Sequence, residues 1–209
     1  MSTIKSKKVQ IGYDSTSTNN FTLYQPATPD GTLRIGVGNA DSPTEVARFD
    51  STGMVGSGKV LQVLQAVKTD TFSTTSTSYV DITGLTVSIT PSSTSSKILV
   101  MYNTSGGMAG DVAHGYINIF RDGTELVNVT SASNREGGMN VFNTGTQQQP
   151  SVSGYYLDSP ASTSSLTYQI RVKSSNGQAV YVNRSARDTD NSQYDGRSIS
   201  TVTVMEIAG

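Results

Sequence analysis

The feature that most constrains the fold is a regular alternation of apolar and polar residues in short runs separated by turn residues. Successive side chains of a β-strand point to opposite faces, so a period of two residues indicates a strand with one buried face. Residues 199–207 are the clearest case, because Val202, Val204 and Glu206 alternate with the side chains of the opposite face. No stretch of ten residues has a helical period. The sequence therefore predicts an all-β fold.

Turn chemistry divides the chain into strands about ten residues apart, which is typical of a β-sandwich or jelly roll. Asp122-Gly123 lies between two alternating runs and predicts a tight hairpin. Ser174-Ser175-Asn176-Gly177 predicts a second turn. The expected strands are 9–11, 21–24, 33–37, 46–49, 60–67, 79–83, 85–90, 97–102, 115–120, 125–129, 152–157, 166–172, 179–183 and 199–207.

A change in the length and apolar content of the expected strands near residue 58 predicts two domains. Before it the expected strands are short, and after it they are longer and more apolar. Gly53, Gly56 and Gly58 lie close together, and such glycine density indicates a flexible linker. We expect residues 1–58 to form an attachment and oligomerisation module of intertwined short strands. Residues 59–209 are expected to form a projecting β-sandwich or jelly roll.

Composition excludes several classes of protein. Apolar residues make up only 34% of the 209 residues, so the chain is expected to have a thin core and to bury surface against a partner subunit. There is no cysteine, which excludes disulfides and thiolate metal sites. The net charge of -1 gives no electrostatic basis for binding nucleic acid. No apolar run spans a membrane, and the basic N-terminal residues precede no apolar segment, so no secretory signal is expected.

The sequence offers no catalytic constellation and no cofactor motif. His114 is the only histidine, so a histidine-rich metal site is excluded, and a polar structural role is expected for it. The Gly-x-Ser-x-Gly motif is absent, although serine and aspartate are abundant. The glycines of residues 31–38 lack the spacing and the following helix of a nucleotide-binding loop. We expect a protein that is not an enzyme.

One polar loop, residues 187–196, is a weak candidate for a metal site. Asp188, Asp190, Asn191 and Asp195 supply oxygen ligands of the kind that Ca²⁺ prefers. Their order does not match an EF-hand and no closing glutamate follows. The interpretation we favour is a solvated loop without metal.

Tyrosine is the commonest aromatic residue. Tyr155, Tyr156, Tyr168 and Tyr181 fall within expected strands, where side-chain packing is the expected role. Tyr194 lies in the polar loop instead. An exposed tyrosine ring could stack on a sugar or fill an interface.

Two groups of segments resemble proteins of tailed-bacteriophage virions. Residues 19–26 (NNFTLYQP) and 29–39 (PDGTLRIGVGN) resemble the N-terminal module of small tail-fibre, head-fibre or head-decoration proteins. Residues 59–63 (KVLQV), 81–91 (DITGLTVSITP) and 96–100 (SKILV) resemble a β-rich C-terminal domain common in phages of aquatic bacteria. The resemblance implies a homotrimer on the virion surface that contacts other virion proteins, such as capsid or tail subunits.

Three functional classes remain open at this point. The first is a virion-surface structural protein, either a head-decoration or head-fibre protein or a tail fibre that binds a host receptor. The absence of coiled-coil heptads favours the head. The second is a carbohydrate-binding module that uses tyrosine faces, with host-surface glycan as its ligand. The third is a glycan-degrading enzyme, which needs a pair of carboxyl groups in a cleft.

Overall fold

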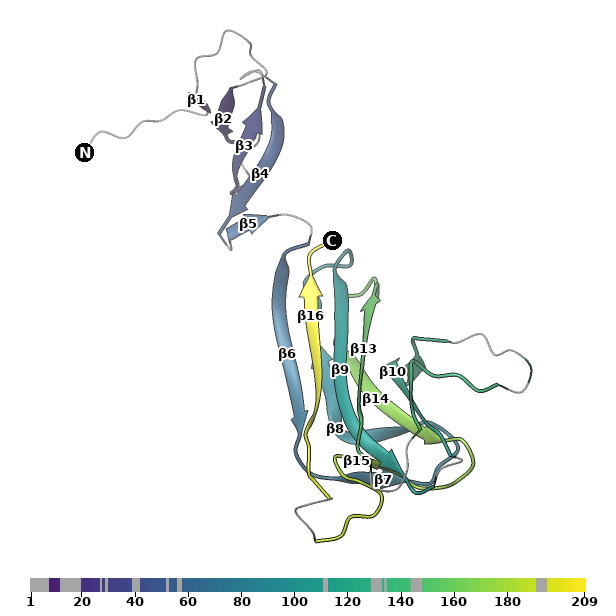
Figure 1. Cartoon of the computed structure of the whole chain (residues 1–209). Helices are drawn as coiled ribbons and strands as arrows, with labels where there is room; N and C mark the ends of the chain where they lie inside the picture. Colours follow the sequence, from purple (N-terminus) through teal and green to yellow (C-terminus); the bar gives the residue numbers. More distant parts are fainter. Residues whose placement is uncertain are drawn as a thin grey trace. The chain divides into compact units, whose positions relative to one another are not determined.

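A computed structural model describes residues 8–11, 20–26, 28, 30–38, 42–51, 53–55, 58–110, 113–128, 133, 135–143, 148–190 and 195–209 (Figure 1). The described residues form strands, turns and irregular segments without any helix, so an all-β fold is confirmed. Among the described residues there is no helix that is long and apolar enough to cross a membrane. The chain divides into two compact units, Met1–Lys59 and Val60–Gly209.

The first unit is a single antiparallel sheet in which every strand pairs with the next one along the chain. Its strands are β1 (Lys8–Ile11), β2 (Phe21–Tyr24), β3 (Leu33–Val37), β4 (Thr44–Asp50) and β5 (Gly53–Val55). Gly53 was expected in a linker, but it pairs with Asp50 and begins β5. Gly53 has φ +114°, a backbone conformation that glycine adopts without strain and that suits the tight connection between β4 and β5.

The two faces of this sheet differ sharply in polarity. Directly paired residues of neighbouring strands point to the same face. One face therefore carries apolar side chains: Phe21, Leu23, Leu33, Ile35, Val37, Ala47, Phe49 and Met54. On the other face Glu45 accepts hydrogen bonds from Arg34 (3.0 Å) and Arg48 (2.8 Å). Phe21 is 52% exposed and Met54 is 56% exposed, so the apolar face is open.

The second unit is a β-sandwich, as predicted. In one sheet the strand order is β6–β16–β9–β15–β7, and β13 also pairs with β9. In the other sheet the strand order is β11–β10–β14–β8, and β12 also pairs with β10. The first sheet contains β6 (Val60–Lys68), β7 (Phe72–Thr74), β9 (Lys97–Met108), β13 (Ser151–Asp158), β15 (Val180–Val182) and β16 (Ser200–Ile207). The second contains β8 (Val80–Ile89), β10 (Gly115–Arg121), β11 (Thr124–Glu125), β12 (Asn140–Phe142) and β14 (Leu166–Ser174).

Strict alternation of buried and half-exposed residues builds the core between these sheets. In β14 every second residue from Leu166 to Ser174 is buried, and in β16 Val202, Val204 and Glu206 point inward. Each fully buried Val, Leu or Ile stabilises the fold by about 1.5–3 kcal/mol. The thin core expected from composition is therefore not found in the sandwich, because the apolar residues are concentrated on the inner faces.

Several expected boundaries differ from the structure. The two strands expected at 79–83 and 85–90 are one strand, β8, with an irregularity opposite Gln169–Arg171. Gly84, with φ +90°, lies in this irregularity. The strand expected at 125–129 is reduced to β11, and the short strands β7 and β12 were not expected. A strand of two or three residues is too short to show a period of two.

Candidate interaction surface

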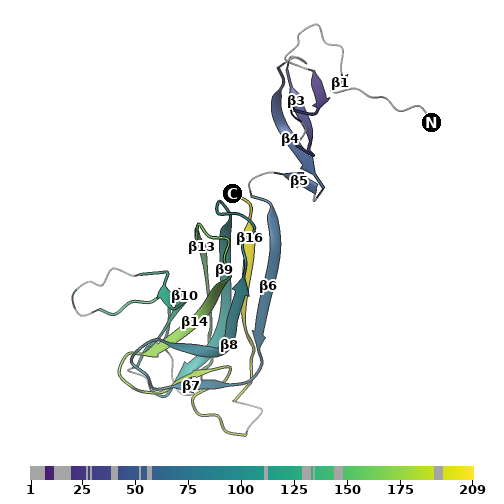
Figure 2. The same cartoon turned by 180° about the vertical axis from the view of Figure 1, so that it is seen from behind.

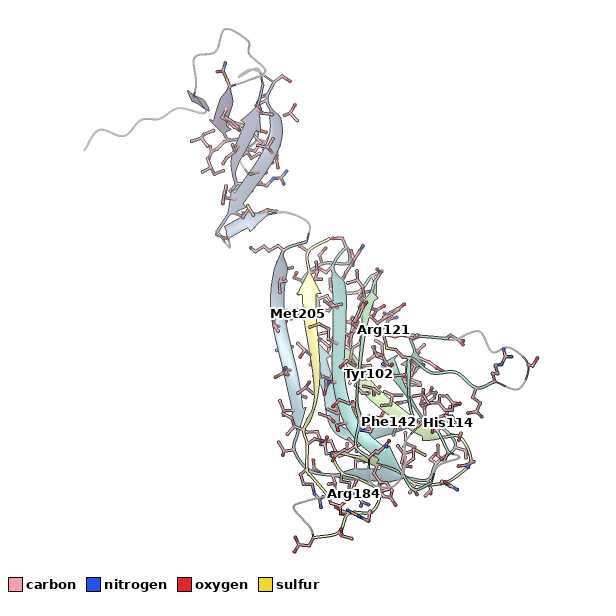
Figure 3. The ribbon with its side chains drawn as sticks, in the orientation of Figure 1. Tyr102, His114, Arg121, Phe142, Arg184 and Met205 are labelled. Atoms are coloured by element: carbon pink, nitrogen blue, oxygen red, sulfur yellow. The ribbon has the colours of Figure 1, made fainter. Side chains whose placement is uncertain are left out.

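Among the described residues of the sandwich, apolar side chains gather on the outer face of β6, β16, β9 and β13. Figure 1 shows these four strands side by side. Their pairing places outward side chains in four rows: Val60–Ile207–Lys97, Val63–Met205–Leu99–Leu157, Gln65–Thr203–Met101–Tyr155 and Val67–Thr201–Asn103–Ser153. We call this surface the β6–β13 face. Its second row is apolar across all four strands, and Met205, labelled in Figure 3, is part of that row.

Several side chains of the β6–β13 face are open to solvent. Val63 is 52% exposed, Leu157 is 48% exposed and Tyr155 is 77% exposed. The polar side chains in the rows bond to each other across the strands. Gln65 Nε2 donates to Thr203 Oγ1 (2.8 Å), and Asn103 Nδ2 donates to Ser153 Oγ (2.7 Å). A contiguous apolar surface that is uncovered in a single chain marks an interaction site.

The outer face of the second sheet has a different character. Figure 2 shows β8, β14 and β10 from behind. Asn118 and Phe120 point outward from β10 yet are buried. Residues 135–139 contribute to this covering, since Tyr79 Oη donates to the Gly137 carbonyl (3.3 Å) and Lys173 pairs with Glu136 (3.3 Å). This face also carries charges, and its described residues form no open apolar row comparable with those of the β6–β13 face.

Strand β6 also forms one edge of its sheet. It pairs with β16 on one side, and no described strand pairs with the other side. Proteins usually protect such an edge with charged residues, proline or a covering segment. The eight residues from Val60 to Val67 contain neither charge nor proline. The free edge of β6 therefore leaves backbone N–H and C=O groups without this protection, next to the apolar rows.

The polar loop predicted as a weak metal candidate is organised by arginine side chains. Asp188 pairs with Arg184 (2.9 Å) and Arg197 (2.5 Å). Figure 3 shows Arg184 at the end of the sandwich opposite to the end where β16 terminates. Asp190 is exposed, and Asn191 lies outside the described residues. Asp188 thus pairs with guanidinium groups of the chain itself.

Asp195 is held in the same way by internal donors. It accepts hydrogen bonds from Ser185 Oγ (2.6 Å), from Thr189 and from Arg187 Nε (3.0 Å). These bonds, that from Ser185 most of all, keep the pKa of Asp195 below its ordinary value. The described residues contain no cluster of three His, Asp or Glu side chains that could hold a metal ion. A cation would have to displace the arginine side chains to reach these carboxylates.

We therefore expect removal of divalent cations to leave the thermal stability unchanged. A metal bound only by the native state would raise the melting temperature, and a chelator would lower it. Thermal melts of the full chain with and without EDTA should coincide within about 1 °C. A drop of several degrees with EDTA, restored by Ca²⁺, would contradict the interpretation of the loop as a metal-free structure.

His114 and the tyrosines are dispersed over the sandwich. The His114 ring stacks on Tyr116 (centroids 6.1 Å apart), and its Nε2 lies 3.2 Å from Asn143 Nδ2. Tyr168 is buried in the core, and Arg184 lies 3.9 Å from the Tyr181 ring centroid. Tyr194 is outside the described residues. Of the described tyrosines among these, Tyr155 is the one that lies on an open apolar surface.

Two buried carboxylates were not identified from the sequence as structural residues. Asp158 accepts hydrogen bonds from Arg121 (2.5 Å) and Tyr168 Oη (2.7 Å), and so connects β13 with β10 and β14 of the other sheet. Glu206 is 1% exposed and accepts from Gln62, Ser92 and Ser96. The only signal in the sequence was that Glu206 alternates in phase with Val202 and Val204.

The sequence matches no protein-family profile and no curated protein. Among solved structures, it aligns with a chain of the T13 viral particle of infectious bursal disease virus (12% identity, TM-score 0.39). It also aligns with a chain of the Gx strain of that virus (13% identity, TM-score 0.38). The alignments cover 90% and 91% of this chain, which spans about half of those chains (45% and 52%).

Proposed function

We propose that this chain is a structural protein displayed on the surface of a virus particle, where it works as a homotrimer. The resemblance of residues 19–26, 29–39, 59–63, 81–91 and 96–100 to tailed-phage virion proteins supports this proposal. The absence of coiled-coil heptads favours a head-decoration or head-fibre protein over a tail fibre. The observation that carries the proposal is the pair of open apolar sheet faces, one in each unit. Such faces suit a protein that functions within an assembly.

The division of labour between the two units is part of the proposal. The first unit is one sheet with one apolar and one charged face, and a sheet needs a second layer to bury its apolar face. We assign that layer to another virion protein or to other copies of the unit. The sandwich has its own core and supplies the projecting domain.

A truncated protein that starts at Lys59 tests this division. Because the sandwich core is closed without the first unit, we expect cooperative unfolding and a β-type circular dichroism spectrum. The same protein should fail to bind particles that the full chain decorates. An unfolded truncated protein would contradict the independence of the sandwich. Binding to particles as strong as that of the full chain would place the attachment site in the sandwich instead.

The location itself is tested by labelling particles with an antibody raised against the sandwich. Label at regular positions over the head supports a decoration or head-fibre protein, and label at the tail supports a tail fibre. The virus particles are purified until their protein composition no longer changes. If the antibody then labels none of them, the proposal is contradicted.

A carbohydrate-binding module is the second candidate, and the 77% exposure of the Tyr155 ring is the observation that favours it. Aromatic rings exposed to this degree can stack on sugars. In that case glycan binding should be detectable with the full chain and lost in Tyr155→Ala. The apolar row formed by Val63, Met205, Leu99 and Leu157 beside Tyr155 weighs against this candidate, since it offers no polar groups to sugar hydroxyls.

A further inference from the structure

We propose that the β6–β13 face is the surface through which copies of this chain contact one another. The inference rests on the proposed function in that it takes the chain to work as a homo-oligomer. It goes further by assigning the contact to one face of the sandwich, and by naming another copy of this chain as the occupant.

The apolar surface is continuous across the sheet. Val63, Met205, Leu99 and Leu157 adjoin one another across four paired strands, and Met101 and Tyr155 continue the patch in the next row. Single exposed apolar residues are normal on protein surfaces, whereas a continuous uncovered patch is not. Burying such a patch is favourable in proportion to the apolar area removed from water.

The scarcity of charge on the β6–β13 face selects the occupant. Lys97, at one end, is the only charged residue in the four rows. When copies of one chain meet through the same face, each charge approaches others of the same sign. A face whose single charge lies at one end therefore suits a contact with itself, and it offers little to a strongly charged partner. The hydrogen bonds from Gln65 to Thr203 and from Asn103 to Ser153 run within the face, so a covering copy does not have to break them.

The area of the β6–β13 face also fits such a contact. Four strands about 4.8 Å apart and about eight residues long, at about 3.3 Å per residue, present roughly 500 Å² of flat surface per copy. Two such faces together give roughly 1,000 Å², the lower limit for a specific protein interface, and the three faces of a homotrimer together give roughly 1,500 Å². The uncharged edge of β6 borders this surface and adds to the area that a neighbouring copy covers.

The experiment compares the mass of the full chain with that of variants that place a charge in this face. Val63→Glu and Leu157→Glu are suitable because both side chains are already about half exposed, so the core is untouched. Thr86→Glu on β8 is the matched control, since Thr86 is exposed on the outer face of the other sheet. Circular dichroism checks that each variant is folded.

Light scattering at micromolar concentration should give an oligomer for the unchanged chain and for Thr86→Glu. Val63→Glu and Leu157→Glu should self-associate at least tenfold more weakly and shift to the monomer mass. A monomeric unchanged chain would overturn the inference, and so would folded Val63→Glu and Leu157→Glu variants with the mass of the unchanged chain.

A second measurement needs no substitution. Met101 and Met205 lie on the β6–β13 face, and methionine sulfur is readily oxidised where it is accessible. Mass spectrometry after brief peroxide treatment should show both residues becoming more oxidised as the chain is diluted. Met139, which packs against the core and lies outside the four rows, reports any general effect of dilution. Oxidation of Met101 and Met205 that does not depend on concentration, across a range where the mass changes, would overturn the inference.

These results are separable from the test of the proposed function. If the antibody finds the chain on particles but the chain forms no oligomer through this face, the inference is overturned and the virion location stands. If the oligomer depends on Val63 and Leu157 but the antibody finds the chain on no particle, the inference is supported and the virion location is overturned.

Discussion

Replacing Phe142 by alanine is expected to destabilise the sandwich by about 3–5 kcal/mol, because it leaves a cavity where a ring is completely buried. Phe142 belongs to β12, whose backbone pairs with β10 of one sheet. In the same strand Asn140 Nδ2 donates to Tyr102 Oη (2.9 Å) on β9 and to the Ser153 carbonyl (2.7 Å) on β13 of the other sheet. The short strand therefore joins the two layers, and Figure 3 labels Phe142 and Tyr102 in this region.

Val141 provides the matched control in the same strand. It is 43% exposed, so Val141→Ala should change the stability by no more than about 0.5 kcal/mol. For a chain of this size, the Phe142→Ala loss corresponds to roughly 6–20 °C in melting temperature. Thermal melts followed by circular dichroism measure both variants. Equal melting temperatures for the two would contradict the view that β12 holds the layers together.

Replacing Glu206 by glutamine is expected to cost about 2–3 kcal/mol at neutral pH, because it removes a buried charge from a set of donors. Glu206 Oε1 accepts from Ser92 N (2.7 Å), Ser92 Oγ (2.6 Å) and Ser96 Oγ (2.7 Å), and Oε2 accepts from Gln62 Nε2 (2.6 Å). A glutamine amide would place its own donor against that of Gln62. The carboxylate joins the last strand to the connection between β8 and β9 and to the start of β6.

The same site makes the stability depend on pH. Burial is the largest influence on the pKa of Glu206 and raises it, but the hydrogen bonds from Ser92, Gln62 and Ser96 together lower it below its ordinary value of 4.5. A lowered pKa in the folded state means that the contribution is fully present above pH 4.5. It is lost as the pH falls through the folded-state pKa.

The stability difference between the unchanged chain and Glu206→Gln should therefore shrink as the pH is lowered below 4.5. Urea unfolding at a series of pH values measures this difference. Glu136→Gln is the control, because Glu136 forms an exposed ion pair with Lys173 and should contribute less than about 1 kcal/mol. A stability difference for Glu206→Gln that stays constant from pH 7 to pH 3 would show that the ionised carboxylate is not what stabilises the fold.

The longer strands could be predicted because their period is a local property. Residues 166–172 and 199–207 each alternate clearly, and both are strands with one buried face. The two strands expected around Gly84 are one, because an irregularity in pairing with β14 accommodates the glycine without ending the strand. Strands β7 and β12 escaped prediction because their extended conformation depends on pairing with β15 and β10.

The candidate sites could be predicted less well than the long strands, because they are formed by contacts between side chains that the sequence does not reveal. Asp188 and Asp195 looked like potential metal ligands as part of a polar run, but the folded loop directs Arg184, Arg187 and Arg197 toward them. Nothing in the spacing of these residues distinguishes an arginine that pairs with a carboxylate from one that points into solvent. The same is true of Glu206, whose partner Ser92 is 114 residues away in the sequence.

By itself, the sequence determined that the chain is all-β and which side chains share a face of each long strand, because both follow from the two-residue period of the backbone. Only the tertiary structure decided which of the two faces is buried. In β16, Val202 and Val204 point to the core and Met205 lies outside, a choice made by packing against the second sheet. The β6–β13 face arises in the same way, because its rows exist only where four strands from separate parts of the chain lie in register.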